Sequence, residues 1–441
     1  MCAESIGKTV SLGVAWPRDA KPIPSGSPGN TVGQTGLKPC RGRPFGVGGE
    51  LESESQTEIP AYNEEEAMNH YRSVQSRFAG SLSRGAFVVS ALICLSMFVT
   101  PVFAQYKRTD LVSNQAGVAE NQDEHLVNGW GLVALPTSPF WVSDNGTGFS
   151  TLYTGAGQQI PLFVTIPPAP GDPAGTIGTP TGIVGNISPN ANDFTITEND
   201  RSGQAIFIFA TLDGTISGWN PTVDGVDPTT GLSHATIPTG ADRSSVGAVY
   251  TGLAIAVNTS GQAFLYAADD GPNRRIDVFN GTFNFVQSFS DPGIPKGFAP
   301  YGIQAINGQI WVTFTALNKA QGGFVDVFDT AGILVKHFAV DGPLHSPWGI
   351  AQAPANFGPM SNAILISNNI SRGRINAFNP LTGQFLGPLR EASGKPIEID
   401  GVWALQFGQG GGPNGLTNQL FFTAGPNNYA NGLFGVITFG Q

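Results

Sequence analysis

Side chains that bind cations or form hydrogen bonds recur in a series of short polar turns. The residues of these turns are Asp144, Asn145, Asp269, Asp270, Asn318, Asn368, Asn369 and Asn427. Carboxylate and amide oxygens are the ligands that Ca²⁺ takes in proteins. A Ca²⁺ site is therefore one hypothesis, with Asp144, Asp269, Asp270 and Asn369 as its ligands. The alternative is local, because Asn and Asp beside Gly favour tight turns and cap their own backbone amides.

A second set of aromatic and amide residues precedes aliphatic segments. Its members are Asn128, Trp130, Tyr301 and Trp348. Aromatic rings at such positions either stack against a ligand or pack the entry of a strand. Packing is the simpler interpretation of each one alone, whereas their repetition favours a ligand surface.

Motifs of the common hydrolases are absent from the sequence. It has no Gly-x-Ser-x-Gly elbow, no His-Glu-x-x-His helix and no phosphate-binding loop. Four histidines follow residue 105, at His125, His234, His337 and His345, and none has metal-like spacing to another. His125 lies nearest to the candidate ligand residues, and we interpret it as a surface or capping residue. The motifs thus predict no reaction, and we expect a protein that is not an enzyme.

An internal repeat predicts the elements that position these residues. Glycine preceded by a small, aromatic or acidic residue and followed by an aliphatic strand occurs at residues 131, 182, 252, 302, 349 and 401. The intervals are 47 to 52 residues, except for one of 70 that contains a polar insertion at Pro221–Val249. Repeats of 40–50 residues with several strands are typical of propeller blades. We predict an all-β fold, a six-bladed β-propeller.

Two further strands follow in each repeat. The second is a nearly continuous apolar run, such as Ala363–Ser367, and the third alternates apolar and polar residues, such as Arg374–Phe378. These patterns are typical of a central strand and of a strand packed on one face. In a propeller the loops entering the first strand and the loops between the second and third strands share one face. We call it the entry-loop face and predict that it binds the ligand.

The last repeat ends after its third strand, Gly435–Phe439. We expect Tyr106–Val112, which precedes the first repeat, to supply the missing outer strand. This pairing would close the last blade with an N-terminal strand and fix both ends of the ring to one sheet.

A segment typical of a secretion signal precedes the repeats. Basic residues follow Met68, an apolar run of 14 residues spans Ala86–Val99, and Val102 and Ala104 fit a cleavage site after Ala104. The run is shorter than the roughly 20 residues of a permanent span, although an uncleaved anchor is the alternative. We predict a signal peptide at 68–104, a mature domain at 105–441 in the periplasm or medium, and no membrane span after cleavage.

Residues 1–67 are rich in Pro, Gly, Ser and Glu and show no apolar periodicity. They are either a disordered tail or a mis-assigned extension upstream of a true start at Met68, and we favour the extension. Cys2, Cys40 and Cys94 all precede the predicted cut, so the mature domain has no disulfide or thiolate site. The net charge of −10 argues against nucleic acid as a partner.

Several motifs of the first repeat resemble those of a family of exported bacterial propeller proteins of unknown function. The resemblance rests on Leu111–Asn114, Leu126–Leu132, Ser138–Gly148 and Ser150–Tyr153, and it extends over 105–441. Some members carry a PEP-CTERM sorting tail, which is not found before Gln441. The resemblance implies a propeller and no particular activity.

Phe264–Phe279 is more distantly similar to NHL-repeat propellers, which mostly bind partners, and to sugar-lactonase-like propellers, which hydrolyse esters around a metal. Two functions follow. The first is a monomeric binding scaffold for a small molecule, glycan or protein. The second is a metal-dependent lactonase or esterase. Because most of the polar turn residues are Asn rather than carboxylates, we favour binding.

Overall fold

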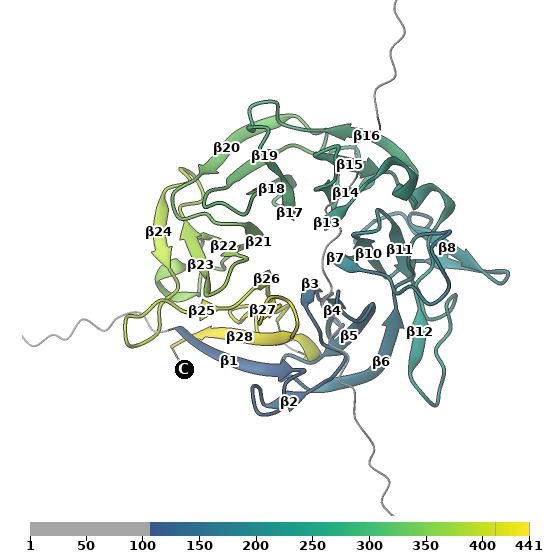
Figure 1. Ribbon diagram of the computed structural model, residues 1–441, viewed down its shortest axis with the longest axis horizontal. Coiled ribbons are helices and arrows are strands. Elements are labelled where there is room, and N and C mark those ends of the chain that lie inside the picture. The colour runs from purple at the N-terminus through teal and green to yellow at the C-terminus, as the bar shows by residue number, and fades with distance from the viewer. Residues whose placement is uncertain (1–105, 411, 441) are drawn as a thin grey trace, which may run out of the picture. The chain divides into compact units, whose positions relative to one another are not determined.

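The computed structural model describes residues 106–410 and 412–440. The predictions for residues 1–67 and for the signal peptide at 68–104 lie outside the described residues. The described residues form six β-sheets arranged as blades around a central axis (Figure 1), which confirms the predicted six-bladed propeller. Four 3₁₀-helices lie in loops of the described residues: η1 (Thr239–Ala241), η2 (Ser244–Val246), η3 (Gly358–Met360) and η4 (Gly412–Asn414).

The blades follow one another along the chain, and each begins with its innermost strand. Blade 1 contains β3 (Gly129–Val133), β4 (Phe140–Asp144), β5 (Phe149–Tyr153) and β6 (Gln159–Thr165). Blade 2 contains β7 (Pro180–Gly185), β10 (Phe207–Thr211) and β11 (Ile216–Trp219), and the hairpin β8 (Thr195–Glu198) and β9 (Arg201–Gln204) lies outside its sheet. Blade 3 contains β13 (Tyr250–Val257), β14 (Ala263–Asp269), β15 (Arg275–Phe279) and β16 (Phe285–Phe289).

The next two blades have the same antiparallel order. Blade 4 contains β17 (Phe298–Ile306), β18 (Gln309–Ala316), β19 (Phe324–Phe328) and β20 (Leu334–Val340). Blade 5 contains β21 (Pro347–Gln352), β22 (Ile364–Asn368), β23 (Gly373–Phe378) and β24 (Phe385–Pro388), and β25 (Glu398–Ile399) also pairs with β23.

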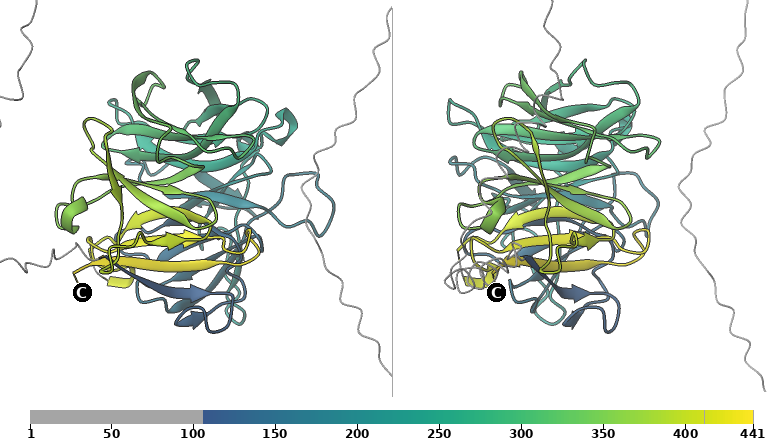
Figure 2. Two further views of the ribbon diagram at one scale, coloured as in Figure 1. Left: turned by 60° about the vertical axis from the view of Figure 1, so that its left-hand side comes forward. Right: turned by 90° about the vertical axis from the view of Figure 1, so that its left-hand side faces the viewer.

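Blade 6 is closed by the N-terminal strand. It contains β26 (Val402–Phe407), β27 (Leu420–Ala424), β28 (Leu433–Phe439) and β1 (Tyr106–Ser113), and β2 (Asn121–Gln122) pairs with β1. β1 runs antiparallel to β28 from Tyr106 opposite Phe439 to Ser113 opposite Leu433. The side views of Figure 2 show blue β1 beside the yellow C-terminal strand. The predicted closure is therefore confirmed, with one more residue in the strand.

The repeated glycine has a steric cause. At Gly131 an added Cβ would collide with the Thr181 carbonyl oxygen, and at Gly302 with that of Trp348. The inner strands of these neighbouring blades thus approach backbone to backbone near the axis, where an added side chain would collide.

The sixth repeat was predicted at Gly401, which is wrong by three residues. Gly401 lies in the turn before β26, and Trp403–Leu405 occupies the place that Trp130–Leu132 has in blade 1, with Ala404 in the position of glycine. Alanine in that position removed the glycine signal from the last repeat.

The insertion at Pro221–Val249 is mostly loop, and it also contains one short strand and two 3₁₀-helices. Its strand β12 (Leu232–His234) pairs parallel with β6 and extends the sheet of blade 1. Thr236 and Asp242 form single bridges to β11 and its turn, where blade 2 lacks a regular fourth strand. The insertion thus connects two blades.

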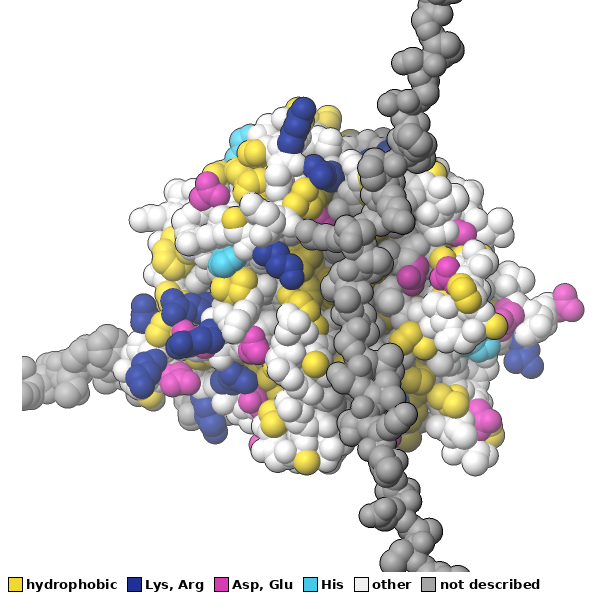
Figure 3. All heavy atoms as spheres, in the orientation of Figure 1, with side chains coloured by type: hydrophobic (Ala, Val, Ile, Leu, Met, Phe, Trp, Pro, Cys, Tyr) yellow, Lys and Arg dark blue, Asp and Glu magenta, His cyan; other side chains and the backbone are white. Residues whose placement is uncertain are grey.

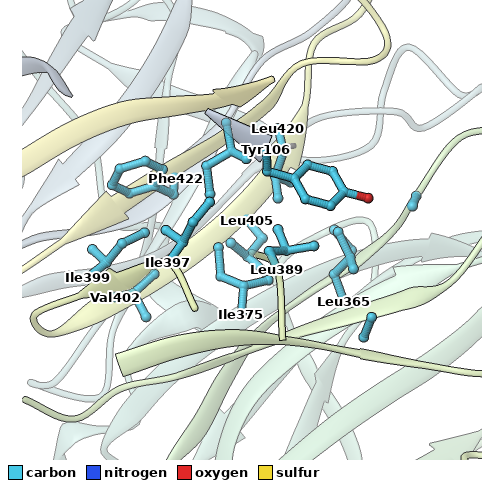
Figure 4. Close-up of a cluster of buried hydrophobic side chains, with 14 of the residues drawn as sticks. Tyr106, Leu365, Ile375, Leu389, Ile397, Ile399, Val402, Leu405, Leu420 and Phe422 are labelled. Atoms are coloured by element: carbon cyan, nitrogen blue, oxygen red, sulfur yellow. The ribbon is translucent and has the colours of Figure 1, made fainter. Parts of the chain in front are cut away.

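Apolar side chains fill the spaces between adjacent blades. Figure 4 shows the cluster between blades 5 and 6, where Leu365 and Ile375 of blade 5 face Leu405 and Phe422 of blade 6. Tyr106 joins this cluster from β1, and its hydroxyl donates to the Phe357 carbonyl at 2.8 Å. Burial raises the pKa of the Tyr106 hydroxyl to about 12. Each such buried side chain stabilises the ring by about 1.5–3 kcal/mol.

Candidate functional site

The inner strands begin at a cluster of aromatic side chains, which we call the aromatic cluster. Its members are Trp130, Tyr301, Trp348, Trp403 and Tyr429. Trp403 is at its centre and stacks on Trp130 with ring centroids 3.7 Å apart. The rings of Tyr429, Tyr301 and Trp348 lie 5.5, 5.7 and 5.8 Å from that of Trp403. The cluster fills the entry-loop end of the central channel.

Hydrogen bonds fix the aromatic cluster to the blades around it. The Trp403 indole donates to Asn128 Oδ1 at 2.9 Å, and the Trp348 indole donates to the Thr251 carbonyl at 3.0 Å. The Tyr429 hydroxyl donates to Asn369 Oδ1 at 2.7 Å. Below these rings the channel contains a cavity of about 20 Å³, which has space for about one water molecule.

Most of the predicted amide residues form hydrogen bonds that connect the entry loops and the turns. Asn128 donates to Asn145 Oδ1 at 3.1 Å, and Asn145 donates in turn to the Pro180 carbonyl. Asn368 accepts from the His345 amide and donates to the Pro343 carbonyl. Asn369 donates to the Val402 carbonyl at 3.3 Å. The structure therefore brings these residues together blade by blade, as loop-packing groups.

The remaining members of the predicted set differ in exposure. Asn318 and Asn427 are exposed, and Asp270 and Tyr301 are partly buried. The Asn427 amide donates to Asp400 Oδ2 at 2.9 Å. Burial raises the pKa of Tyr301 well above its usual range, and Tyr429 and Asp270 nearby add to this shift. The exposed part of the predicted face is thus its rim, around a packed centre.

Asp269 has a structural role in its turn. Its Oδ1 accepts hydrogen bonds from the Val249 and Gly271 amides, both at 2.9 Å, and its Oδ2 accepts one from Asn273. Burial raises the pKa of Asp269, and these hydrogen bonds oppose the shift. The carboxylate therefore joins the entry loop of blade 3 to the turn after β14.

Asp144 is fully buried beside blade 6. Its carboxylate oxygens make no hydrogen bond of good geometry with described residues, although the Thr151 hydroxyl lies beside them. Burial raises the pKa of Asp144 well above its usual range, Thr151 opposes that shift and Asp123 adds to it. Asp123 itself accepts from the Tyr153 hydroxyl at 2.8 Å and from Gln159 at 2.6 Å. Side chains alternate along β4, so Asp144 lies on the same face as Phe140, which packs against blade 6.

The opposite end of the channel is hollow. The inner strands end around a space of about 450 Å³, which we call the strand-exit hollow. Its polar lining comes from five amide side chains, which are Gln304, Asn307, Gln352, Gln406 and Gln409. Aliphatic residues and Phe407 form the rest, and no Asp, Glu, Lys, Arg or His lines it among the described residues. This volume is in the range of small-molecule sites.

The amides of the strand-exit hollow are partly held in place. Asn307 donates to Gln352 Oε1 at 2.8 Å across two blades. Gln406 accepts from the Ala134 amide and donates to the Ala134 carbonyl. Gln304 is exposed on β17. The sequence contained a signal for this site, because an amide follows the aliphatic strand in three successive repeats, at Gln304, Gln352 and Gln406.

Charged side chains lie mainly away from the channel. Figure 3 shows Lys and Arg side chains gathered at the left-hand rim, over β23 to β25 in the orientation of Figure 1. Arg372 and Arg374 there pair with Glu398 at 2.6 and 2.8 Å. These exposed pairs contribute little stability.

Two groups of three ionisable side chains have ligand atoms that converge among the described residues. One contains Glu198, Asp224 and His234, and the other contains Asp291, Asp326 and His337. Asp144, Asp269 and Asp270 belong to neither group. The predicted Ca²⁺ site therefore stays a prediction that the arrangement of these carboxylates does not favour.

No protein-family model matches the chain. The uncharacterized protein L690 of Acanthamoeba polyphaga mimivirus is 30% identical over 348 residues, which are 75% of this chain and 85% of the viral protein. The chain belongs to the same family. The uncharacterized protein R648 of that virus is 30% identical over 356 residues, 75% of this chain and 80% of the relative.

These relatives can be compared with the family that the motifs of the first repeat resemble. They are viral proteins, so they do not support membership of a family of exported bacterial propellers or a link to PEP-CTERM tails. Among solved structures, virginiamycin B lyase from Staphylococcus aureus is 12% identical, with 76% of this chain and 99% of that chain covered and a TM-score of 0.42. The WD40 propeller domain of Doa1 is 11% identical, covers 76% and 97%, and has a TM-score of 0.38.

Of the helices in the described residues, none has the length and apolar content needed to cross a bilayer.

Proposed function

We propose that the protein is a binding module, and that its ligand occupies the strand-exit hollow. The lining of this hollow is the observation that supports the proposal. About 450 Å³ of space is surrounded by amides and apolar side chains, with no ionisable group among its lining residues. General acid–base catalysis uses a titratable group beside the substrate. Such a lining is better suited to holding a ligand than to converting one.

The lining also defines the class of ligand. A charged ligand would lose its hydration without gaining an opposite charge, which is costly. An uncharged molecule with hydroxyl or amide groups would form hydrogen bonds with Gln304 and Gln352, while its apolar parts would pack against Ile187 and Phe407. We therefore propose an uncharged, hydrogen-bonding small molecule, and neutral sugars are the first probes.

Binding calorimetry with a panel of neutral sugars and their charged counterparts tests this proposal. We expect binding only of uncharged members, and weaker binding in Gln304→Leu and Gln352→Leu. Gln384→Leu, which changes an exposed glutamine in the turn between β23 and β24, is the matched control. Binding that both hollow variants leave unchanged, and that Asn318→Ala or Asn427→Ala weakens, would place the ligand on the entry-loop face instead.

The entry-loop face stays a prediction as a surface for a protein or glycan. Its exposed residues Asn318 and Asn427 surround a centre filled by the aromatic cluster. We do not propose the metal-dependent lactonase, because Asp269 holds a turn and Asp144 lies buried between blades. Export also stays a prediction, and amino-terminal sequencing of the secreted protein would test cleavage after Ala104.

A further inference from the structure

Asp277 and Asp326 occupy the same position in the third strands of blades 3 and 4. Each is the middle residue of its strand, in Arg275–Phe279 and in Phe324–Phe328. Asp277 is paired with cations, since Arg275 Nε lies 2.7 Å from its Oδ1 and Arg243 Nε lies 3.7 Å from its Oδ2. The Tyr250 hydroxyl donates to Oδ2 as well, at 3.0 Å. Positive charge therefore compensates this buried carboxylate.

Asp326 has a second carboxylate as its neighbour instead. Its Oδ1 lies 2.9 Å from His337 Nδ1, and Asp291 Oδ2 lies 3.5 Å from the same nitrogen. The three ligand atoms of Asp291, Asp326 and His337 all lie within 4.8 Å of one another. Two carboxylates thus face one imidazole, so with both carboxylates ionised the group is at least one positive charge short of neutrality.

Two buried oxygens of this group lack a hydrogen-bond partner among the described residues. They are Asp291 Oδ2 and Asp326 Oδ2, although both residues are more than nine-tenths buried. Asp291 Oδ1 accepts from the Gly293 amide at 2.8 Å, which orients the carboxylate with Oδ2 toward the imidazole. Buried acceptors without a hydrogen bond cost free energy that a cation would recover.

We propose that Asp291, Asp326 and His337 bind one divalent transition-metal ion, with Zn²⁺ as the best match. Ligand atoms at about 2.1 Å from Zn²⁺ in a tetrahedron lie about 3.4 Å apart, close to the separations of 2.9 and 3.5 Å. Imidazole suits Zn²⁺ and disfavours Ca²⁺ and Mg²⁺, which prefer oxygen ligands. The His337 side chain is 52% exposed, so solvent reaches the fourth position.

The second group of convergent ligand atoms, that of Glu198, Asp224 and His234, differs in the hydrogen bonds of its buried carboxylate. Asp224 Oδ1 accepts from Thr236 and Oδ2 accepts from the Asn220 amide, so neither oxygen is unpaired. His234 and Glu198 form a pair at 2.7 Å. This group supplies the matched control for the metal site.

Zinc titration calorimetry tests the proposal on the full chain, freed of metal by a chelator and alkylated at its cysteines. We expect one Zn²⁺ equivalent that His337→Gln and Asp326→Asn weaken by more than about tenfold. His234→Gln and Asp277→Asn should leave it unchanged. The proposal would be overturned if the wild-type protein bound no Zn²⁺ equivalent that His337→Gln loses. It would also be overturned if His234→Gln lost that Zn²⁺ equivalent instead.

A second measurement does not depend on how well the variants fold. Zn²⁺ should shift the ¹⁵N resonance of His337 Nδ1 in the wild-type chain, because that nitrogen faces both carboxylates. A shift confined to Nε2, or no shift at saturating Zn²⁺, would overturn the proposed ligand set. Binding of sugars at the strand-exit hollow is independent of either result.

Discussion

The two ends of the central channel are built from the same six inner strands and differ sharply. At the entry-loop end, Trp130, Trp348 and Trp403 are buried and packed against one another. At the other end, the strands finish in amides around a hollow of about 450 Å³. One end of the ring therefore contributes mainly packing energy, whereas the other leaves an unfilled hollow.

The cause lies in the side chains that each strand places at its two ends. Near the start of the strands, glycine lets neighbouring backbones approach, and tryptophans from three blades fill the axis. Near the end, Gln304 and Gln352 are exposed and leave the axis unfilled. Local side-chain volume thus separates the packed end from the end that we propose to bind a ligand.

Removal of β1, the strand that closes blade 6, is expected to destabilise both ends of the central channel. Deletion of Tyr106–Ser113 exposes the edge of β28 and removes the buried side chains of Tyr106, Leu111 and Val112. At about 1.5–3 kcal/mol each, their loss would remove a large part of the stability of a typical domain. Urea denaturation should show an unfolded or severely destabilised protein. An unchanged midpoint, like that expected for the exposed control Lys107→Ala, would contradict this prediction.

Trp403→Ala should damage the entry-loop end alone. The substitution leaves a cavity among four aromatic rings and removes the hydrogen bond to Asn128. We expect a loss of about 3–5 kcal/mol in the free energy of unfolding. Phe407→Ala, in the lining of the strand-exit hollow, is the control and should cost clearly less. Equal losses would show that the two ends do not differ in packing.

Asp144→Asn should change the pH dependence of stability at the entry-loop end. The raised pKa of Asp144 means that the folded protein keeps a proton that the unfolded chain has lost. The free energy of unfolding should therefore fall as pH rises through the window between the usual Asp pKa and the raised one. An asparagine amide does not ionise in this window, so the variant should be more stable than wild type at pH 8 and closer to it at pH 4.

Denaturation curves at both pH values give this difference, and Asp200→Asn, which changes an exposed carboxylate, is the control. A variant that is less stable than wild type at pH 8 would show that the Asp144 charge is compensated in the folded state.

The smallest effect on stability is expected at the hollow. Gln304→Leu changes an exposed side chain on the inner strand of blade 4, and surface changes of this kind stay within about 0.5 kcal/mol. Thermal unfolding without ligand should therefore match wild type, while sugar binding falls. A large stability loss would show that this end also holds the ring together.

The fold was predictable because its signals are local and repeated. Glycine recurs in five of the six inner strands, and the incomplete last repeat pointed to Tyr106–Val112 as its partner. The predicted position of the last repeat was wrong because Ala404 stands where the other repeats have glycine. The strand Leu232–His234 could not be predicted, since parallel pairing with another blade leaves no local pattern.

The candidate sites were less predictable for a related reason. Asp291, Asp326 and His337 come from a connection and two strands, and nothing in their spacing marks their convergence. Asp144 and Asp269 sit in similar turns, yet one carboxylate faces a blade interface and the other caps a loop. Which role an acidic turn residue takes depends on tertiary neighbours that the sequence does not reveal.

The closure of blade 6 also sets an order of events during synthesis. Ser113 hydrogen-bonds the Gly432 carbonyl across a separation of 319 residues. At about 5–20 residues per second, the partner of β1 leaves the ribosome many seconds after β1 itself. During that interval β1 has an unpaired edge and exposed apolar residues, so a chaperone that holds this segment would have a defined period in which to act.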